Sequence, residues 1–211
     1  MFVREITMKP VDAISYRSSH TSINRLSVAV LGVTAFIVAI GAMASAQGRF
    51  AQKTPNGIAF SEFEGYETWQ MIAPSQPDDA GGCGSTPAPG CIKAILGNPA
   101  MMKAFSGGIP SNGQAVPDGA VMAKVEWRKK SDDASPYAVT IPGTLSEVSF
   151  MLKDAKRFPG TNGWGYATFR YEAASGAWKA FGENAAFANT CHACHTRVKT
   201  HDFVYTSYAS R

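Results

Sequence analysis

The residues best suited to chemistry lie near the carboxyl end of the chain, in the Cys-x-x-Cys-His element Cys191-His192-Ala193-Cys194-His195. Two thiols at this spacing can each add across a vinyl group of one haem and form two thioether bonds, while the adjacent imidazole is held where it can ligate the iron. The element therefore predicts one covalently bound haem c, attached through Cys191 and Cys194 and ligated by His195.

Two other interpretations of the thiol pair stay open at this point. A zinc site needs four ligands, and a thioredoxin-like redox pair is expected in a βαβ context rather than on the last short stretch of a chain. Neither interpretation needs the histidine that directly follows the second cysteine. The remaining cysteines and histidines of the chain are Cys83, Cys91, His20, His192 and His201.

The haem face opposite His195 decides which chemistry follows. Residues 196–211 contain no methionine, so a sixth iron ligand has to come from earlier in the chain. Because a methionine at helical or strand spacing is more often a core residue, the sequence favours a five-coordinate iron with an open face. The methionines available upstream are Met71, Met101, Met102, Met122 and Met151.

Residues 1–46 have the organisation of a secretory signal peptide. A basic region precedes an apolar run from Leu26 to Ala44, which ends in the small-x-small element Ala44-Ser45-Ala46. An uncleaved membrane anchor is the alternative, because the apolar run is long for a signal, and Met8 offers a second start. Since haem c is attached outside the cytoplasmic membrane in bacteria, both features predict a periplasmic protein with a mature haem domain over residues 47–211.

The composition indicates one domain of modest charge. Residues 47–211 are enough for a single core. The chain has 20 Lys and Arg against 16 Asp and Glu, a net charge of +4 that lies partly in the signal and is too small to suggest nucleic acid as a partner. Cys83 and Cys91 flank a turn-rich loop and are expected to form a disulfide in an oxidising compartment; a metal role for them lacks further ligands nearby.

The pattern of apolar residues predicts an α+β fold: a single domain with a mainly antiparallel β-sheet and flanking helices. Val121–Trp127 alternates, with Val121, Ala123, Val125 and Trp127 on one face. Turn residues separate it from two further predicted strands, Leu145–Lys153 and Trp164–Tyr171. Helices are expected over Gly65–Ala73, Ile92–Leu96, Ala100–Phe105 (opened by Asn98-Pro99) and Ala177–Ala188, which leads into the haem motif.

From Tyr66 to Tyr205 the chain resembles the cytochrome P-460 and cytochrome c′-beta family. The resemblance depends on the order of short motifs together with the carboxyl-terminal Cys-x-x-Cys-His element. It implies a mainly antiparallel sheet with helices, often a homodimer, and a His-ligated iron with a vacant distal side. The motifs are Tyr66-x-x-Trp69, Gly97-Asn98-x-Ala100, Pro117-Asp118-Gly119, Lys124, Met151-Leu152-Lys153-Asp154, Arg157-Phe158, Gly163-Trp164-Gly165 and Asp202-Phe203-Val204-Tyr205-Thr206.

The resemblance implies one of two chemistries. The P-460 members cross-link a lysine side chain to the haem and oxidise hydroxylamine, whereas the c′-beta members bind nitric oxide in an apolar pocket without established turnover. Lys124 matches the cross-linking lysine, since it lies shortly after the Pro117-Asp118-Gly119 turn. The alternative for Lys124 is a solvated lysine on a strand.

In P-460 enzymes a distal glutamate takes a proton from the nitrogen substrate, and Ser149 occupies the matching position here. Glu147 lies two residues earlier on the same strand face, where a bulge could bring it into the site, although an ordinary surface acid is the alternative. A serine facing the iron favours ligand binding over efficient oxidation. Phe150 and Met151 are expected to keep the pocket apolar.

Three further residues are weaker candidates. His192 is expected to point away from the iron, His201 to lie at the surface, and Arg157 to contact a haem propionate or solvent. The sequence as a whole predicts an exported mono-haem c protein, an oxidoreductase for hydroxylamine or nitric oxide that passes electrons to an external redox partner. The alternatives are a non-catalytic nitric oxide carrier or sensor, and an electron-transfer cytochrome with Met as sixth ligand.

Overall fold

A computed structural model describes residues 48–78, 83 and 90–208 of the chain. The predicted signal peptide, residues 1–46, lies outside the described residues. Within the described part, no helix has the length and apolar character needed to cross a membrane.

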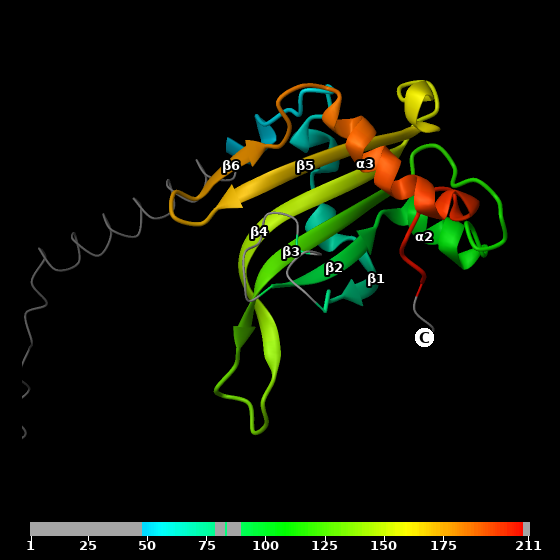
Figure 1. Cartoon of the computed structure of the whole chain (residues 1–211). Helices are drawn as coiled ribbons and strands as arrows, with labels where there is room; N and C mark the ends of the chain where they lie inside the picture. Colours follow the sequence, from blue (N-terminus) through cyan, green and yellow to red (C-terminus); the bar gives the residue numbers. More distant parts are fainter. Residues whose placement is uncertain (1–47, 79–82, 84–89, 209–211) are drawn as a thin grey trace, which may run out of the picture. The chain divides into compact units, whose positions relative to one another are not determined.

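A six-stranded antiparallel sheet forms the centre of the domain (Figure 1). Its strands lie side by side in the order in which they occur in the sequence, so the sheet is a simple meander. With its few flanking helices, the sheet confirms the predicted α+β class. The strands are β1 (Gln70–Ser75), β2 (Cys91–Gly97), β3 (Val121–Ser131), β4 (Thr140–Lys153), β5 (Trp164–Glu172) and β6 (Ala177–Ala180).

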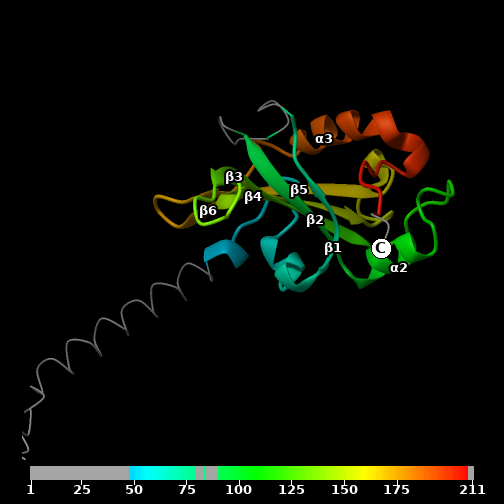
Figure 2. The ribbon, with the colours of Figure 1, turned by 90° about the horizontal axis from the view of Figure 1, so that it is seen from below.

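The two faces of the sheet pack against different elements, as Figure 2 shows. On one face, called here the η1 face, the short helices η1 (Phe60–Phe63) and η2 (Tyr66–Thr68) bury aromatic side chains against the strands. The opposite face, the α3 face, is covered by α2 (Pro99–Ser106), α3 (Phe187–His195) and the carboxyl-terminal segment with η5 (Thr196–His201). A further short helix, η4 (Pro159–Thr161), precedes β5.

Alternation along the strands assigns each side chain to a face. On β3, Ala123 and Val125 belong to the core of the η1 face, with Val121 and Trp127 packed against it, as predicted. Met122 belongs to the core of the α3 face, and Lys124 and Glu126 follow it at the two-residue period of a strand. The polar residues of β3 therefore lie on the side of the sheet that carries α3.

The three predicted strands and one predicted helix are confirmed. The strands lie within β3, β4 and β5. The helix expected over Ala100–Phe105 is α2, which begins after Asn98. The side chain of Asn98 accepts a hydrogen bond from the backbone N–H of Met101 at 2.9 Å, and Pro99 occupies the first helical position, so both residues favour a helix start here.

The helix predicted over Ile92–Leu96 is wrong, because this segment is the middle of β2. It pairs with β1 on one side and with β3 on the other. A short apolar run does not distinguish a buried strand from a helix, and pairing on both edges decided the outcome.

Two further helix predictions are also wrong. Gly65–Ala73 contains only the single turn η2, because Gln70 already pairs with Gly97 as the first residue of β1. Ala177–Ala188 is divided between β6 and the start of α3. Gly182 lies between the two elements with a φ of 107°, a left-handed conformation that interrupts a helix.

The register of β3 and β4 brings three of the predicted site residues together. Lys124 lies opposite Ser149, and Glu126 lies opposite Glu147. The next pair joins Trp127 to Leu145, so β4 carries one extra residue at this point, a β-bulge at Ser146. A disulfide joins Cys83 to Cys91, the first residue of β2, with 5.6 Å between their Cα atoms.

Candidate functional site

A cavity of about 880 Å³ lies between the α3 face of the sheet and the carboxyl-terminal part of the chain. Side chains from β2, β3, β4 and β5 line it on one side, and Cys191, Cys194, His195 and residues 204–207 line it on the other. A larger cleft of about 1210 Å³ adjoins it at Arg170 and Phe181, but none of the motif residues lines that cleft. We therefore place the candidate site in the smaller cavity.

The Cys-x-x-Cys-His element forms the last turns of α3. In a helix, residues three and four positions apart lie on one face, so Cys191 presents its thiol on the same side as Cys194 and His195. Among the nine residues of α3, all of which the structure describes, Ala188 alone is buried. A helix this short is marginal by itself, and three of its residues, Cys191, Cys194 and His195, line the cavity. A group that fills the cavity would complete the packing of α3.

The imidazole of His195 is held in one orientation. Its Nδ1 lies 2.7 Å from the carbonyl oxygen of Phe203. Because a carbonyl only accepts hydrogen bonds, Nδ1 carries the proton and Nε2 keeps its lone pair, which is the tautomer that binds a metal through Nε2. Burial lowers the pKa of His195 and outweighs the opposing effect of the Phe203 hydrogen bond, so the ring is neutral at neutral pH.

The two cysteines of α3 differ in their surroundings. Both are free thiols, Cys191 partly buried and Cys194 exposed. Burial raises the pKa of the Cys191 thiol, with Lys124 acting in the opposite direction. Over residues 48–78, 83 and 90–208, no three His, Cys, Asp or Glu side chains gather in an arrangement that could hold a metal ion.

His192 points away from the cavity, as the sequence predicts. Its Nδ1 lies 3.1 Å from the hydroxyl of Tyr166, and its Nε2 lies 3.1 Å from Oδ1 of Asn162. His201 is exposed in η5. Neither residue lines the cavity, which leaves His195 as the one histidine of the site in the part of the chain that the structure describes.

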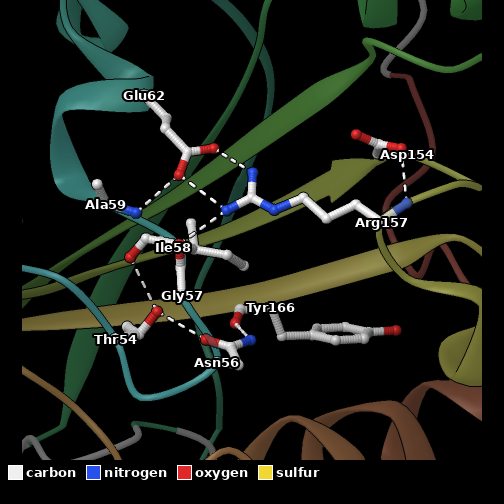
Figure 3. Close-up of polar contacts among 9 residues, drawn as sticks. All are labelled: Thr54, Asn56, Gly57, Ile58, Ala59, Glu62, Asp154, Arg157 and Tyr166. Carbon is white, nitrogen blue, oxygen red and sulfur yellow. Dashed lines mark hydrogen bonds and ion pairs between the residues drawn. The ribbon is translucent and has the colours of Figure 1, made fainter.

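Arg157 is exposed and does not line the cavity, in agreement with the expectation of a solvent-facing arginine rather than a propionate partner. Its guanidinium donates to the carboxylate of Glu62 and to the carbonyl of Gly57, each at 2.9 Å, as Figure 3 shows. Partial burial raises the pKa of Glu62, but the hydrogen bonds from Arg157 and from the backbone of Ala59 lower it by a larger amount, so the net shift of the pKa is downward. Arg157 therefore fastens η1 to the end of β4 on the opposite side of the sheet.

Lys124, Glu147 and Ser149 all line the cavity. The ammonium of Lys124 lies 3.6 Å from Oε1 of Glu147, and the hydroxyl of Ser149 donates to the same oxygen at 3.4 Å. Thr168, on β5, donates to the Ser149 hydroxyl at 2.9 Å. Glu147 is only 3% exposed, so it is not an ordinary surface acid.

Sequence reasoning missed the ionic neighbours of these residues. Glu126, which is fully buried, lies 3.7 Å from the ammonium of Lys93 and 3.9 Å from that of Lys124. Nε of Arg170 lies 3.8 Å from Oε2 of Glu147. Burial lowers the pKa of Lys93, and the nearby charge of Lys124 lowers it further. We call the set of Lys93, Lys124, Glu126, Glu147 and Arg170 the charged cluster.

The register explains why these charges occur together. Two carboxylates directly opposite each other on neighbouring strands repel, and Glu126 and Glu147 are such a pair. The three cations around them offset that repulsion at a site with little access to water. The strand alternation that places Lys124 and Glu126 on one face was the signal that could have identified the cluster.

The apolar part of the cavity wall differs from the expected one. Met122 and Met151 line it from opposite positions on β3 and β4. The ring of Phe150, by contrast, lies in the core of the η1 face, stacked on Phe63 with 3.9 Å between ring centroids. Both residues border the cavity as predicted, but only Met151 has its side chain on the α3 face of the sheet.

The remaining candidate sixth ligands lie elsewhere. Met101 and Met102 are buried on α2, and Met71 is 45% exposed on β1. None of the three lines the cavity.

The site fits a haem by its own chemistry. It combines two free thiols, an imidazole with an available Nε2 and a cavity large enough to hold a planar group beneath α3. The sequence profile described as Cytochrome P460 matches residues 63–206, most of the chain, whereas no curated protein sequence matches it. The chain therefore belongs to the cytochrome P460 family, whose cofactor is haem.

Proposed function

We propose that the protein is a periplasmic mono-haem c oxidoreductase that acts on hydroxylamine or nitric oxide. In this proposal Cys191 and Cys194 form the two thioether bonds and His195 ligates the iron. The observation that carries the proposal is the convergence of the motif with Lys124 and Glu147 on one cavity. Membership of the cytochrome P460 family supports the haem itself.

The haem c would supply an iron that binds a small nitrogen ligand and transfers electrons to an external redox partner. The protein residues determine how that iron is held. The Nε2 lone pair of His195 is fixed toward the cavity by the hydrogen bond from Nδ1 to Phe203. Cys191 and Cys194, one helical turn apart, would hold the haem through the two thioether bonds on the side of α3 that carries His195.

Lys124 is the proposed site of the cross-link to the haem. A lysine amine reacts as a nucleophile only after it has lost its proton. The carboxylates of Glu147 and Glu126 lie 3.6 and 3.9 Å from the Lys124 ammonium, beyond direct hydrogen-bond reach, and could receive that proton through one water. Because neighbouring carboxylates favour the charged ammonium, the support for a role beyond that of a solvated surface lysine is the position of Lys124 on the cavity wall.

Glu147 is the proposed base for substrate oxidation. The oxidation of hydroxylamine to nitric oxide removes equal numbers of electrons and protons, so a proton acceptor in the cavity is needed. The hydroxyls of Thr168 and Ser149 form a hydrogen-bonded chain that ends on the Glu147 carboxylate. Arg170, which contacts Glu147, lines both the cavity and the larger cleft, so Glu147 lies near the boundary between the two spaces.

A nitric oxide carrier or sensor is the second candidate function. One observation favours it: Ser149, rather than a carboxylate, lies directly opposite Lys124. A hydroxyl hydrogen-bonded to its neighbours can position a ligand but is a poor base at neutral pH. An electron-transfer cytochrome is the third candidate, and Met122 and Met151 on the cavity wall are its proposed sixth ligands.

Intact mass and absorption spectra of the protein, produced in cells that mature haem c, test the proposed cofactor. We expect the mass of one haem added to the mature chain, and loss of the attachment when Cys191 and Cys194 are both replaced by Ser. A high-spin resting spectrum is expected for an open sixth position. A colourless protein contradicts the whole proposal, and a low-spin resting state supports the electron-transfer candidate.

Comparison of the wild type with a Lys124→Arg variant tests the cross-link. The arginine keeps the charge near Glu147 but cannot supply the amine, so we expect an altered ferrous absorption spectrum and haem that is attached through the thioethers alone. Identical spectra for the two proteins contradict a cross-link. Steady-state hydroxylamine consumption with an artificial electron acceptor then separates the enzyme from the carrier, because a carrier shows no turnover.

Cell fractionation tests the proposed compartment. We expect the haem protein in the periplasmic fraction with Gln47 as its first residue, because cleavage is predicted after Ala46. Recovery with the membrane fraction and an intact amino terminus supports an uncleaved anchor.

A further inference from the structure

The carbonyl group that orients His195 belongs to an unusual backbone segment. Phe203, which supplies the carbonyl, has a φ of 65°, and Asp202 before it has a φ of 44°. Both values lie in the left-handed region, which non-glycine residues adopt only at an energetic cost. Two such residues in succession persist only where surrounding contacts hold them.

The side chain of Asp202 provides the contacts that hold this segment. Its carboxylate accepts hydrogen bonds from the Lys153 ammonium at 2.9 and 3.0 Å, and from the backbone N–H of Val116 at 2.8 Å. Lys153 is 7% exposed, so the ion pair lies away from water. A charge-assisted pair in such surroundings is stronger than a surface pair and has a fixed geometry.

Lys153 also contacts Asn162, the residue that holds His192, the other histidine of the motif. Its ammonium donates to the carbonyl of Asn162 at 3.0 Å. Asn162 has a φ of 55°, and its side-chain oxygen lies 3.1 Å from Nε2 of His192. One ammonium group at the end of β4 therefore holds two left-handed segments, and each segment contacts one of the two histidines.

We propose that Lys153 and Asp202 are positioning residues for the axial ligand. They hold the Phe203 carbonyl against Nδ1 of His195 and thereby control how strongly the imidazole donates electrons through Nε2. A carbonyl that accepts from Nδ1–H makes a ligating imidazole more basic, and a more basic ligand stabilises ferric over ferrous iron. Neither residue lines the cavity, so both act through His195. The inference rests on the proposed ligation by His195.

The test is a Lys153→Met variant of the haem-loaded protein. Methionine fills the space of the lysine stem but provides no ammonium, so Asp202 loses its ion pair and keeps only the hydrogen bond from Val116. The Phe203 carbonyl is then held less firmly against His195. We expect the equilibrium constant for iron reduction to rise by up to about tenfold, a positive shift of the midpoint potential of up to ~59 mV for one electron. We also expect a lower iron–histidine stretching frequency in the resonance Raman spectrum of the ferrous protein.

Lys179→Met is the matched control. Lys179 forms an ion pair of 2.6 Å with Glu172, but the pair is exposed and Lys179 does not line the haem cavity. This variant should keep the potential and the stretching frequency of the wild type. Lys153→Arg, which keeps a cation near Asp202, should restore most of both values.

Asp202→Asn is the second variant, in case Lys153→Met does not fold. It keeps a hydrogen-bond acceptor for Val116 but removes the charge, and we expect the same direction of change in both measurements. Wild-type values in a haem-loaded Lys153→Met or Asp202→Asn protein overturn the inference. Loss of haem from both variants overturns it too, because it assigns the pair to folding alone. Absence of an iron–histidine band in the wild type contradicts the proposed function instead.

Discussion

Glu126 and Glu147 allow a matched test of the proposed base. Both are buried on the α3 face, they lie directly opposite each other on β3 and β4, and both contact the ammonium of Lys124. Glu147 lines the cavity and Glu126 does not. A change from Glu to Gln at each position removes one charge and keeps the volume of the side chain, so the two variants differ mainly in access to the substrate.

The expected magnitudes separate catalysis from stability. A general base contributes about 10²–10⁴-fold to a rate, so Glu147→Gln should lower hydroxylamine turnover by this factor, or about 2.7–5.4 kcal/mol of transition-state stabilisation. Each substitution leaves cations with less compensation and should cost about 1–3 kcal/mol of folding free energy. Because Glu126 is fully buried, its loss should destabilise the fold at least as much as the loss of Glu147.

The assay is steady-state hydroxylamine oxidation with an artificial acceptor, measured together with urea unfolding and with nitric oxide binding to the ferrous protein. We expect Glu147→Gln to bind nitric oxide with nearly unchanged affinity and to turn over slowly. Glu126→Gln should turn over at a rate within a few-fold of the wild type. Equal losses of turnover in the two variants would refute the assignment, because they would indicate that the charged cluster acts only through its net charge.

Two further predictions concern the η1 face. Phe150→Ala should lower the free energy of unfolding, measured in urea, by about 3–5 kcal/mol, because the buried ring of Phe150 stacks on Phe63. The haem spectrum should stay unchanged, since the ring faces away from the cavity. A changed spectrum with little loss of stability contradicts this orientation of the ring. Arg157 lowers the net pKa of Glu62, so their pair stabilises the fold fully above the ordinary Glu value of 4.5, and the contribution is lost as the pH falls through the lowered value. The difference in unfolding free energy between the wild type and Arg157→Met should be below about 1 kcal/mol, because both side chains are about a third exposed. This difference should narrow as the pH falls below 4.5, and a difference that does not change with pH contradicts the assigned cause.

The features that the sequence predicts well depend on short-range patterns. The spacing of Cys191, Cys194 and His195 determines their common helical face wherever the helix lies. The alternation of Val121–Trp127 assigned every side chain of that strand to the correct face. Asn98 and Pro99 identified the start of α2 because a cap acts on the residues next to it.

The features that the sequence does not predict depend on long-range pairing. Ile92–Leu96 is a strand because β1 and β3 supply partners on both edges, and no local residue signals this. The burial of Glu147 follows from its register against Glu126 across the bulge at Ser146. The ion pair of Arg157 with Glu62 was not predicted, because the two residues are 95 positions apart in the chain.

The order of the strands in the sheet has a consequence for the order in which the parts of the domain can fold. Each strand pairs with the one before it, so little loop-closure entropy opposes assembly as the chain emerges. Cys191 and Cys194 follow all six strands in the sequence, and α3 contributes one buried side chain among its nine described residues. The strands that line the cavity can thus pair before α3 packs against them, and Cys191 and Cys194 would stay accessible to the proposed haem attachment until that packing is complete.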